Sequence, residues 1–177
     1  MIKRSGKQTG FTIVELLIVI VVIGILAAIT IVAYSGIQGR ARDAQRLGDM
    51  DTIVKALEMY KTQTGAYPTP SYNGAYGWEV SSINPAGFLS PLKTSGVLSK
   101  VPVDPVNTGN ADIAGSKIYL YYLYSAGYMG CDAAKGPYYI LVAQTGESIA
   151  RATSAPGFIC PSNNWNSYYW STGGFTN

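Results

Sequence analysis

The chain contains no histidine among its 177 residues. Histidine is the commonest general base near neutral pH and the commonest metal ligand in proteins. The chain also has no Gly-x-Ser-x-Gly nucleophile motif, no phosphate-binding loop and no Cys–His arrangement. Its acidic residues Glu79, Asp132 and Glu147 are scattered like ordinary surface groups. We therefore expect no enzymatic activity and no cofactor.

Charged residues are also few, at 13% of the chain. Three of the thirteen basic residues lie among the first ten positions, which leaves ten basic against ten acidic side chains beyond residue 10. The basic residues at positions 40–46 are interspersed with acidic ones, so pairing along a helix or between subunits is favoured over phosphate binding. Nucleic acid is therefore not expected as a main partner.

What the sequence does have is one long apolar run at residues 11–34, in which Glu15 is the single charge. A run of this length can cross a bilayer as one helix. The basic residues before it predict that the C-terminal part faces outside. A simple membrane anchor fits this pattern, but an anchor has no use for Glu15, whose burial in a membrane costs about 2.5 to 3.5 kcal/mol.

The helical pattern continues beyond the run. No proline follows Tyr34 until Pro68, and apolar side chains recur at helical spacing. Gly65 supplies a stop signal after Thr64. We predict one helix from Phe11 to Thr64, with a fully apolar half at residues 11–34 and an amphipathic half at residues 35–65.

Residues 1–10 are basic and polar, and the small residue Gly10 precedes the apolar run. In an ordinary secretory signal the apolar region lies before the cleavage site. Cleavage after Gly10 would instead leave the apolar helix on the mature protein. Residues 1–10 are therefore predicted to be a leader peptide.

The stretch K-Q-T-G-F-T-I-V-E-L-L-I-V-I, from Lys7, resembles the leader and N-terminal helix of type IV pilins and type II secretion pseudopilins. The resemblance implies cleavage between Gly10 and Phe11 by a prepilin peptidase, methylation of the new Phe11 amine, and a role for Glu15 in filament assembly. Pairing of Glu15 with the Phe11 amine of a neighbouring subunit would neutralise both charges; pairing within one chain is the alternative.

Two further segments resemble the same family. Residues 56–69 match it at the end of the helix, and residues 91–105 resemble the short helix and V-P-x-D-P turn of major pseudopilins. Pseudopilins with this segment hold a calcium ion nearby, which makes Asp104 and Asp112 weak calcium candidates. The spacing does not match an EF-hand, and Asp is also an ordinary turn residue, so no metal is the main expectation.

The rest of residues 66–177 predicts a globular head. Aromatic and β-branched runs predict strands at residues 118–125 and 138–145, and a third strand is expected at residues 147–152 after a tight turn. A small antiparallel sheet packed against the amphipathic half-helix gives an α+β, pilin-like fold, with the apolar half protruding.

The two cysteines, Cys131 and Cys160, lie too far apart in sequence for a zinc pair. In a translocated domain they predict one disulfide, with two buried free thiols as the alternative. The tail from Cys160 to Asn177 is rich in aromatic residues and resembles a loop. Either its side chains pack against the sheet edge or they form a surface for binding. The candidates for such a surface are Trp165, Tyr168, Tyr169 and Trp170.

Together these features predict a structural subunit, the major pilin of a type IV pilus used for adhesion, twitching motility or DNA uptake. The expected partners are other copies of the chain in a helical homopolymer, a prepilin peptidase, and an assembly platform with its motor ATPase. The precursor is expected to span the cytoplasmic membrane once and the polymer to reach the cell surface. The alternatives are a pseudopilin of a type II secretion or competence system and a minor tip adhesin or DNA-binding pilin.

Overall fold

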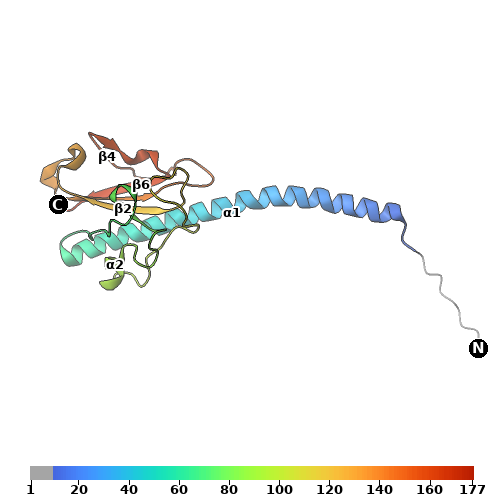
Figure 1. Cartoon of the computed structure of the whole chain (residues 1–177), viewed down its shortest axis with the longest axis horizontal. Helices are drawn as coiled ribbons and strands as arrows, with labels where there is room; N and C mark the ends of the chain where they lie inside the picture. Colours follow the sequence, from blue (N-terminus) through green and yellow to red (C-terminus); the bar gives the residue numbers. More distant parts are fainter. Residues whose placement is uncertain (1–9) are drawn as a thin grey trace, which may run out of the picture. The chain divides into compact units, whose positions relative to one another are not determined.

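A computed structural model describes residues 10–177, apart from the side chains at positions 32, 33 and 35, and its architecture is α+β as predicted (Figure 1). The predicted leader therefore lies outside the described residues except for Gly10. In chain order the elements are α1 (Ile13–Thr64), η1 (Ala75–Gly77), β1 (Glu79–Val80), α2 (Ser90–Thr94), β2 (Tyr119–Tyr124), η2 (Tyr128–Gly130), η3 (Ala133–Lys135), β3 (Tyr138–Ala143), β4 (Ile159–Cys160), β5 (Asn163–Asn164), η4 (Trp165–Ser167) and β6 (Trp170–Phe175).

Backbone contacts divide the chain into two units, Met1–Gln38 and Gly39–Asn177. The first unit contains the apolar part of α1, which is long and apolar enough to cross a membrane. The second unit contains the amphipathic part of the helix and all of the strands.

Helix α1 ends at Thr64, where the sequence predicts it to end. Gly65 has a φ of +83°, a left-handed conformation that glycine adopts without steric cost. Its N–H donates to the carbonyl of Lys61 at 2.8 Å, which satisfies one of the orphan carbonyls at the helix end.

The sheet has four antiparallel strands in the order β1-β2-β3-β6. Tyr121 of β2 lies opposite Leu141 of β3, and Leu141 lies opposite Thr172 of β6. Because successive side chains of a strand point to opposite faces, the sheet is apolar on both sides.

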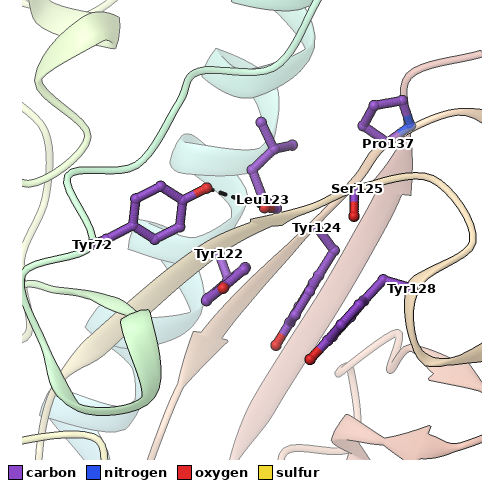
Figure 2. A pocket seen from close by; sticks show the side chains of 7 residues that line it. All are labelled: Tyr72, Tyr122, Leu123, Tyr124, Ser125, Tyr128 and Pro137. Atoms are coloured by element: carbon purple, nitrogen blue, oxygen red, sulfur yellow. Dashed lines mark hydrogen bonds between the residues drawn. The ribbon is translucent and has the colours of Figure 1, made fainter.

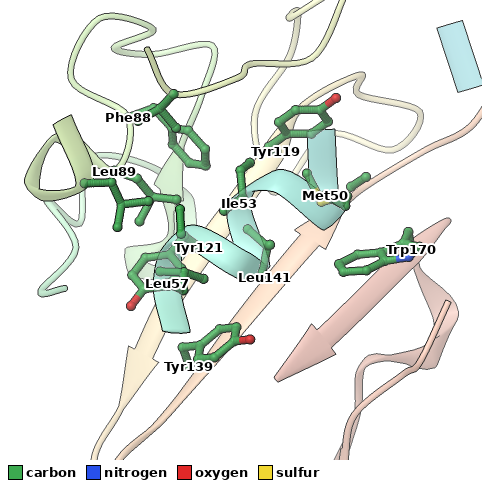
Figure 3. Close-up of a cluster of buried hydrophobic side chains, with 14 of the residues drawn as sticks. Met50, Ile53, Leu57, Phe88, Leu89, Tyr119, Tyr121, Tyr139, Leu141 and Trp170 are labelled. Carbon is green, nitrogen blue, oxygen red and sulfur yellow. The ribbon is translucent and has the colours of Figure 1, made fainter. Parts of the chain in front are cut away.

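One face of the sheet packs against α1 and forms the helix-side cluster, which Figure 3 shows in close-up. The helix contributes Met50, Ile53 and Leu57, each of them fully buried. Among the residues that meet them are Phe88, Leu89, Tyr119, Tyr121, Tyr139, Leu141 and Trp170. Burial of one such aliphatic side chain stabilises the fold by roughly 1.5 to 3 kcal/mol.

The other face of the sheet carries a second group of buried side chains, the outer cluster. Its strand residues alternate with those of the helix-side cluster, as a pleated sheet requires. It includes Trp78, Ile118, Leu120, Ile140, Val142 and Trp165. The small hairpin of β4 and β5 brings Cys160 to this face.

The predicted third strand is wrong. Residues 147–152 form a loop, and the fourth strand of the sheet is β6, which lies in the tail that the sequence describes as a loop. The Thr-Gly-Gly run of β6 gives this segment a low strand propensity, since glycine is depleted in strands. The structure explains the glycine: a Cβ on Gly173 would lie 2.6 Å from the carbonyl oxygen of Tyr139.

Candidate functional site

The predicted cleavage site lies at an uncovered position. Among the described residues, none apart from its chain neighbour lies within 4 Å of where a Cβ on Gly10 would be, and Phe11 is 77% exposed. The first helical residue, Ile13, follows shortly after. The peptide bond between Gly10 and Phe11 therefore lies just before the helix begins.

Glu15 is held by Thr12 in the same chain. Its Oε2 accepts a hydrogen bond from the Thr12 N–H at 2.8 Å and from Thr12 Oγ1 at 2.7 Å. In return the Glu15 N–H donates to Thr12 Oγ1 at 3.2 Å. This reciprocal arrangement is a capping box, and its signature Thr-x-x-Glu is visible in the sequence. Glu15 thus has a local partner before any neighbour is present.

The apolar part of α1 is uncovered along its length. Its large aliphatic side chains between Ile13 and Ile31 are 47% to 83% exposed. A contiguous apolar surface of this size is not stable in water. This part of the helix therefore requires lipid or other apolar helices around it.

Within the globular unit, Arg46 is the centre of an ion network. Its side chain is 0% exposed. The guanidinium donates to both carboxylate oxygens of Asp104, at 2.7 and 3.0 Å, and at 2.8 Å to each of Asp43 and Glu147. Arg42 adds a bidentate pair with Glu147. The network joins α1 to the loops that contain residues 104 and 147.

Asp43 extends this network to the backbone. It accepts hydrogen bonds from the N–H groups of Glu147 and Ser148, the latter at 2.7 Å. Burial opposes ionisation of Asp43, but these backbone donors and Arg46 outweigh it and lower its pKa. Hydrogen bonds from Arg42 are the main cause that lowers the pKa of Glu147 to about 2, against desolvation, with Arg46 adding to the effect.

Sequence reasoning missed this network, although one signal of it was present. Arg46 precedes Met50, Ile53 and Leu57 by four, seven and eleven positions, so it falls on the apolar stripe of the helix. A charged residue on such a stripe is buried and needs a counter-charge. The identity of its partners is not readable from that spacing.

The structure gives Asp104, one of the two calcium candidates, another role. Both of its oxygens are engaged by Arg46, and Oδ1 also accepts from the N–H of Val106. Asp112, the other candidate, is exposed. Over residues 10–177, no group of three or more Asp, Glu or Cys side chains is arranged to hold a metal ion.

The interpretation of the aromatic tail as a binding surface is wrong for three of its four residues. Trp165, Tyr169 and Trp170 are buried, and Tyr168 is half-buried. Trp170 belongs to the helix-side cluster and Trp165 to the outer cluster. The tail therefore packs on the sheet because β6 and η4 carry its aromatic side chains inward.

A tyrosine-lined groove of about 410 Å³ lies at the end of β2. Figure 2 shows the rings of Tyr124 and Tyr128 side by side and nearly parallel. The centroids of Tyr122 and Tyr124 are 4.1 Å apart, and those of Tyr124 and Tyr128 are 5.2 Å apart. At these spacings no ligand ring fits between them, so the groove presents hydroxyl-bearing ring edges.

The predicted disulfide between Cys131 and Cys160 is present. It closes a loop that contains η3 and β3 and continues to β4. Both cysteines are buried in the outer cluster, next to residues of the sheet.

Removal of this bridge is expected to destabilise the globular unit. In the chain-entropy model a closed loop of about 30 residues is worth about 3 to 4 kcal/mol. Cys131→Ala with Cys160→Ala should lower the free energy of unfolding by that amount, measured by urea titration of the full chain in detergent. Reduction of the unsubstituted chain is the matched control and should give the same loss. A change below about 1 kcal/mol in both would contradict the prediction.

Glu79 is a buried acidic residue outside the Arg46 network, 1% exposed, on the short strand β1. Its Oε1 accepts from the N–H of Leu89 at 3.0 Å. Leu89 has a φ of +46° and precedes α2, so Glu79 stabilises a backbone position that aliphatic residues rarely adopt. Desolvation raises the pKa of Glu79, and hydrogen bonding from the backbone of Leu89 and from Ser71 opposes this.

The raised pKa of Glu79 makes its contribution to the stability of the fold depend on pH. The folded chain holds the proton more tightly than the unfolded chain, so this contribution is complete below pH 4.5 and is lost as pH rises through the folded pKa. Glu79→Gln keeps the acceptor for Leu89 and cannot ionise. We expect the urea-unfolding stability of this variant to fall less than that of the parent as pH rises above 4.5. Parallel curves for the two proteins would contradict the prediction.

Comparisons with known proteins agree with the resemblance of the N-terminal segment to pilins and pseudopilins. Residues 5–31 match the family model of the prokaryotic N-terminal methylation motif. The chain is 33% identical over 135 residues to type II secretion system core protein G of Pseudomonas aeruginosa, which covers 75% of this chain and 90% of the relative. The corresponding protein of Escherichia coli is 31% identical over 107 residues, 58% of this chain and 70% of the relative. That of Vibrio cholerae is 31% identical over 103 residues, with coverage of 58% and 68%. No solved structure gives a match of comparable significance.

Proposed function

This chain belongs to the family of type IV pilins and type II secretion pseudopilins, and from that premise we propose that it is a pseudopilin, the structural subunit of a short filament in a secretion machine. The observation that carries the proposal is the similarity to core protein G over 90% of that relative's length. It favours the pseudopilin alternative over the major pilin that the sequence features alone predict. Adhesion and twitching motility are not part of the proposal.

The proposed assembly uses the uncovered half of α1. The precursor spans the membrane once, with its aliphatic side chains facing lipid, and the globular unit faces away from the cytoplasm. In the polymer the same side chains contact the apolar helices of neighbouring copies. Lipid tails and apolar helices are similar environments for these side chains. Transfer of the helix from the membrane into the polymer, by an assembly platform and its motor ATPase, therefore loses little apolar burial.

Glu15 is proposed to change partner during this transfer. In the precursor its carboxylate is bound by Thr12. Cleavage after Gly10 by a prepilin peptidase would create a charged amine on Phe11, one residue away from Thr12. In the polymer Glu15 pairs with that amine on a neighbouring copy, and the pairing sets the axial register of the helices.

The proposal assigns structural rather than catalytic roles to the acidic groups of the globular unit. Asp43, Asp104 and Glu147 are counter-ions of Arg46 and Arg42. No cofactor is required for such a role.

The test is purification of the polymer from cells that express the full chain. N-terminal mass spectrometry should find a first residue Phe11 that carries a methyl group, and electron microscopy should find filaments that stay short. A polymer that keeps the first ten residues would refute the proposed processing. Long surface filaments would instead support the second candidate, a pilus shaft, which the disulfide-closed C-terminal region favours.

A further inference from the structure

A groove with an apolar floor and a basic rim lies beside α2. Its volume is about 490 Å³. Phe88 and Val101 form the buried floor, together with the half-buried Val103. Lys93 and Lys100 stand at its rim and are exposed. We call these five residues the basic groove.

The two lysines of the basic groove have no internal counter-charge. Neither forms an ion pair with any residue in the described part of the chain. Lys100 also lines a pocket with Asp49 and Asp104. However, the carboxylate of Asp104 is occupied by Arg46, and that of Asp49 accepts a hydrogen bond from the Tyr119 hydroxyl. An apolar floor with two unpaired cations suits a ligand that places an aliphatic side chain next to a carboxylate.

The same chain displays such a pair on the corner that follows Asn110. Ile113 is 53% exposed and Asp112 is exposed beside it. The carboxylate of Asp112 makes no hydrogen bond or ion pair within residues 10–177. The backbone of the corner is fixed, because the carbonyl of Ile113 accepts from Ser116 Oγ at 2.8 Å and from Gln144 Nε2 at 3.1 Å.

The groove and the corner belong to different faces of the sheet. The floor residues Phe88 and Val101 are part of the helix-side cluster. Ala111, next to Asp112, packs against the outer cluster on the opposite face. When identical subunits meet through two different surfaces, each contact leaves one free surface for the next subunit. Unless the rotation between neighbouring subunits closes a ring, the contact repeats indefinitely and builds a filament.

We propose that the corner of Asp112 and Ile113 on one subunit docks into the basic groove of the next. Ile113 covers the apolar floor, and Asp112 pairs with Lys93 and Lys100. This inference rests on the proposed function, because it specifies how the globular units of a polymer contact each other.

Charge reversal on either side tests the contact. The processed full-length chain, diluted out of detergent, is assayed for polymer by sedimentation and electron microscopy. Asp112→Lys, and separately Lys93→Glu with Lys100→Glu, should each lower the amount of sedimentable polymer about tenfold, which corresponds to about 1.4 kcal/mol per contact. All substituted side chains are exposed, so the urea-unfolding curves should match those of the unsubstituted chain.

An equal mixture of the two variants should restore polymer. In the mixture the substituted corner of one variant meets the substituted groove of the other with opposite charge, and the two unsubstituted surfaces also meet. Recovery on mixing requires contact between different copies, since a contact within one chain would not change. Asp51→Lys makes the same change of net charge at an exposed ion pair with Lys55 and should keep polymer within about twofold of the parent.

Two results would overturn the docking contact while polymerisation itself stands: polymer yield unchanged in Asp112→Lys, or no recovery in the mixture. If the unsubstituted processed chain formed no polymer at all, the proposed function would fail and this contact with it.

Discussion

Replacement of Glu15 by valine is expected to leave membrane insertion and leader cleavage intact and to abolish polymer. Valine extends the apolar run, so insertion becomes easier. Loss of one partner from a buried ion pair costs about 3 to 5 kcal/mol, so the amount of polymer should fall at least a hundredfold, measured by shearing and sedimentation of filaments. Mass spectrometry of the membrane fraction should still find Phe11 as the first residue.

Two further variants separate the charge of Glu15 from its cap. Glutamine can replace glutamate in a capping box, so Glu15→Gln keeps the contact with Thr12 and removes only the charge. We expect Glu15→Gln to assemble as poorly as the valine variant. Thr12→Val removes the cap and keeps the charge, and its polymer should fall far less, because a lost cap costs about 1 kcal/mol. Normal filaments from Glu15→Gln would show that the capping box is the whole role of this residue.

Replacement of Arg46 by methionine is expected to be the most destabilising single change in the globular unit. It leaves Asp43 and Asp104 buried without their counter-charge, while Glu147 keeps Arg42. Breaking a buried network in this way costs about 3 to 5 kcal/mol. The loss should appear in the free energy of unfolding from urea titration of the full chain in detergent.

Arg40→Met is the matched control, since Arg40 is exposed on the same helix and the substitution is chemically identical. It should change stability by no more than about 0.5 kcal/mol. Equal losses in Arg40→Met and Arg46→Met would contradict the importance of the network.

The Arg46 network also predicts how stability changes in acid. The pKa of Glu147 is lowered from 4.5 to about 2, so its contribution is present above pH 4.5 and is lost as pH falls toward 2. The lowered pKa of Asp43 acts in the same direction. Arg46→Met should therefore lose less stability than the parent over this range. Glu79 acts above pH 4.5 with the opposite sign, so the two effects occupy different pH windows.

The sequence alone determined the long helix, its end, the leader and the pair of cysteines. These features depend on interactions between residues close together in the chain or on composition. The apolar run sets the uncovered half of α1, and Gly65 ends the helix at the predicted position through a left-handed turn. The Thr-x-x-Glu cap of Glu15 is equally local, because its two members are three residues apart, but it was not predicted.

Only the tertiary structure decided the partners of Arg46, the order of the sheet and the burial of the aromatic tail. Asp104 and Glu147 lie 58 and 101 residues beyond Arg46, and no local pattern selects them from the other carboxylates. Strand β6 contains two glycines that weaken its local preference for extended backbone, and pairing with β3 outweighs that preference. Trp165 and Trp170 pack into the clusters on opposite faces of the sheet. Local propensities are worth tenths of a kcal/mol, whereas burial of a large side chain is worth a few kcal/mol, so long-range packing decided these features.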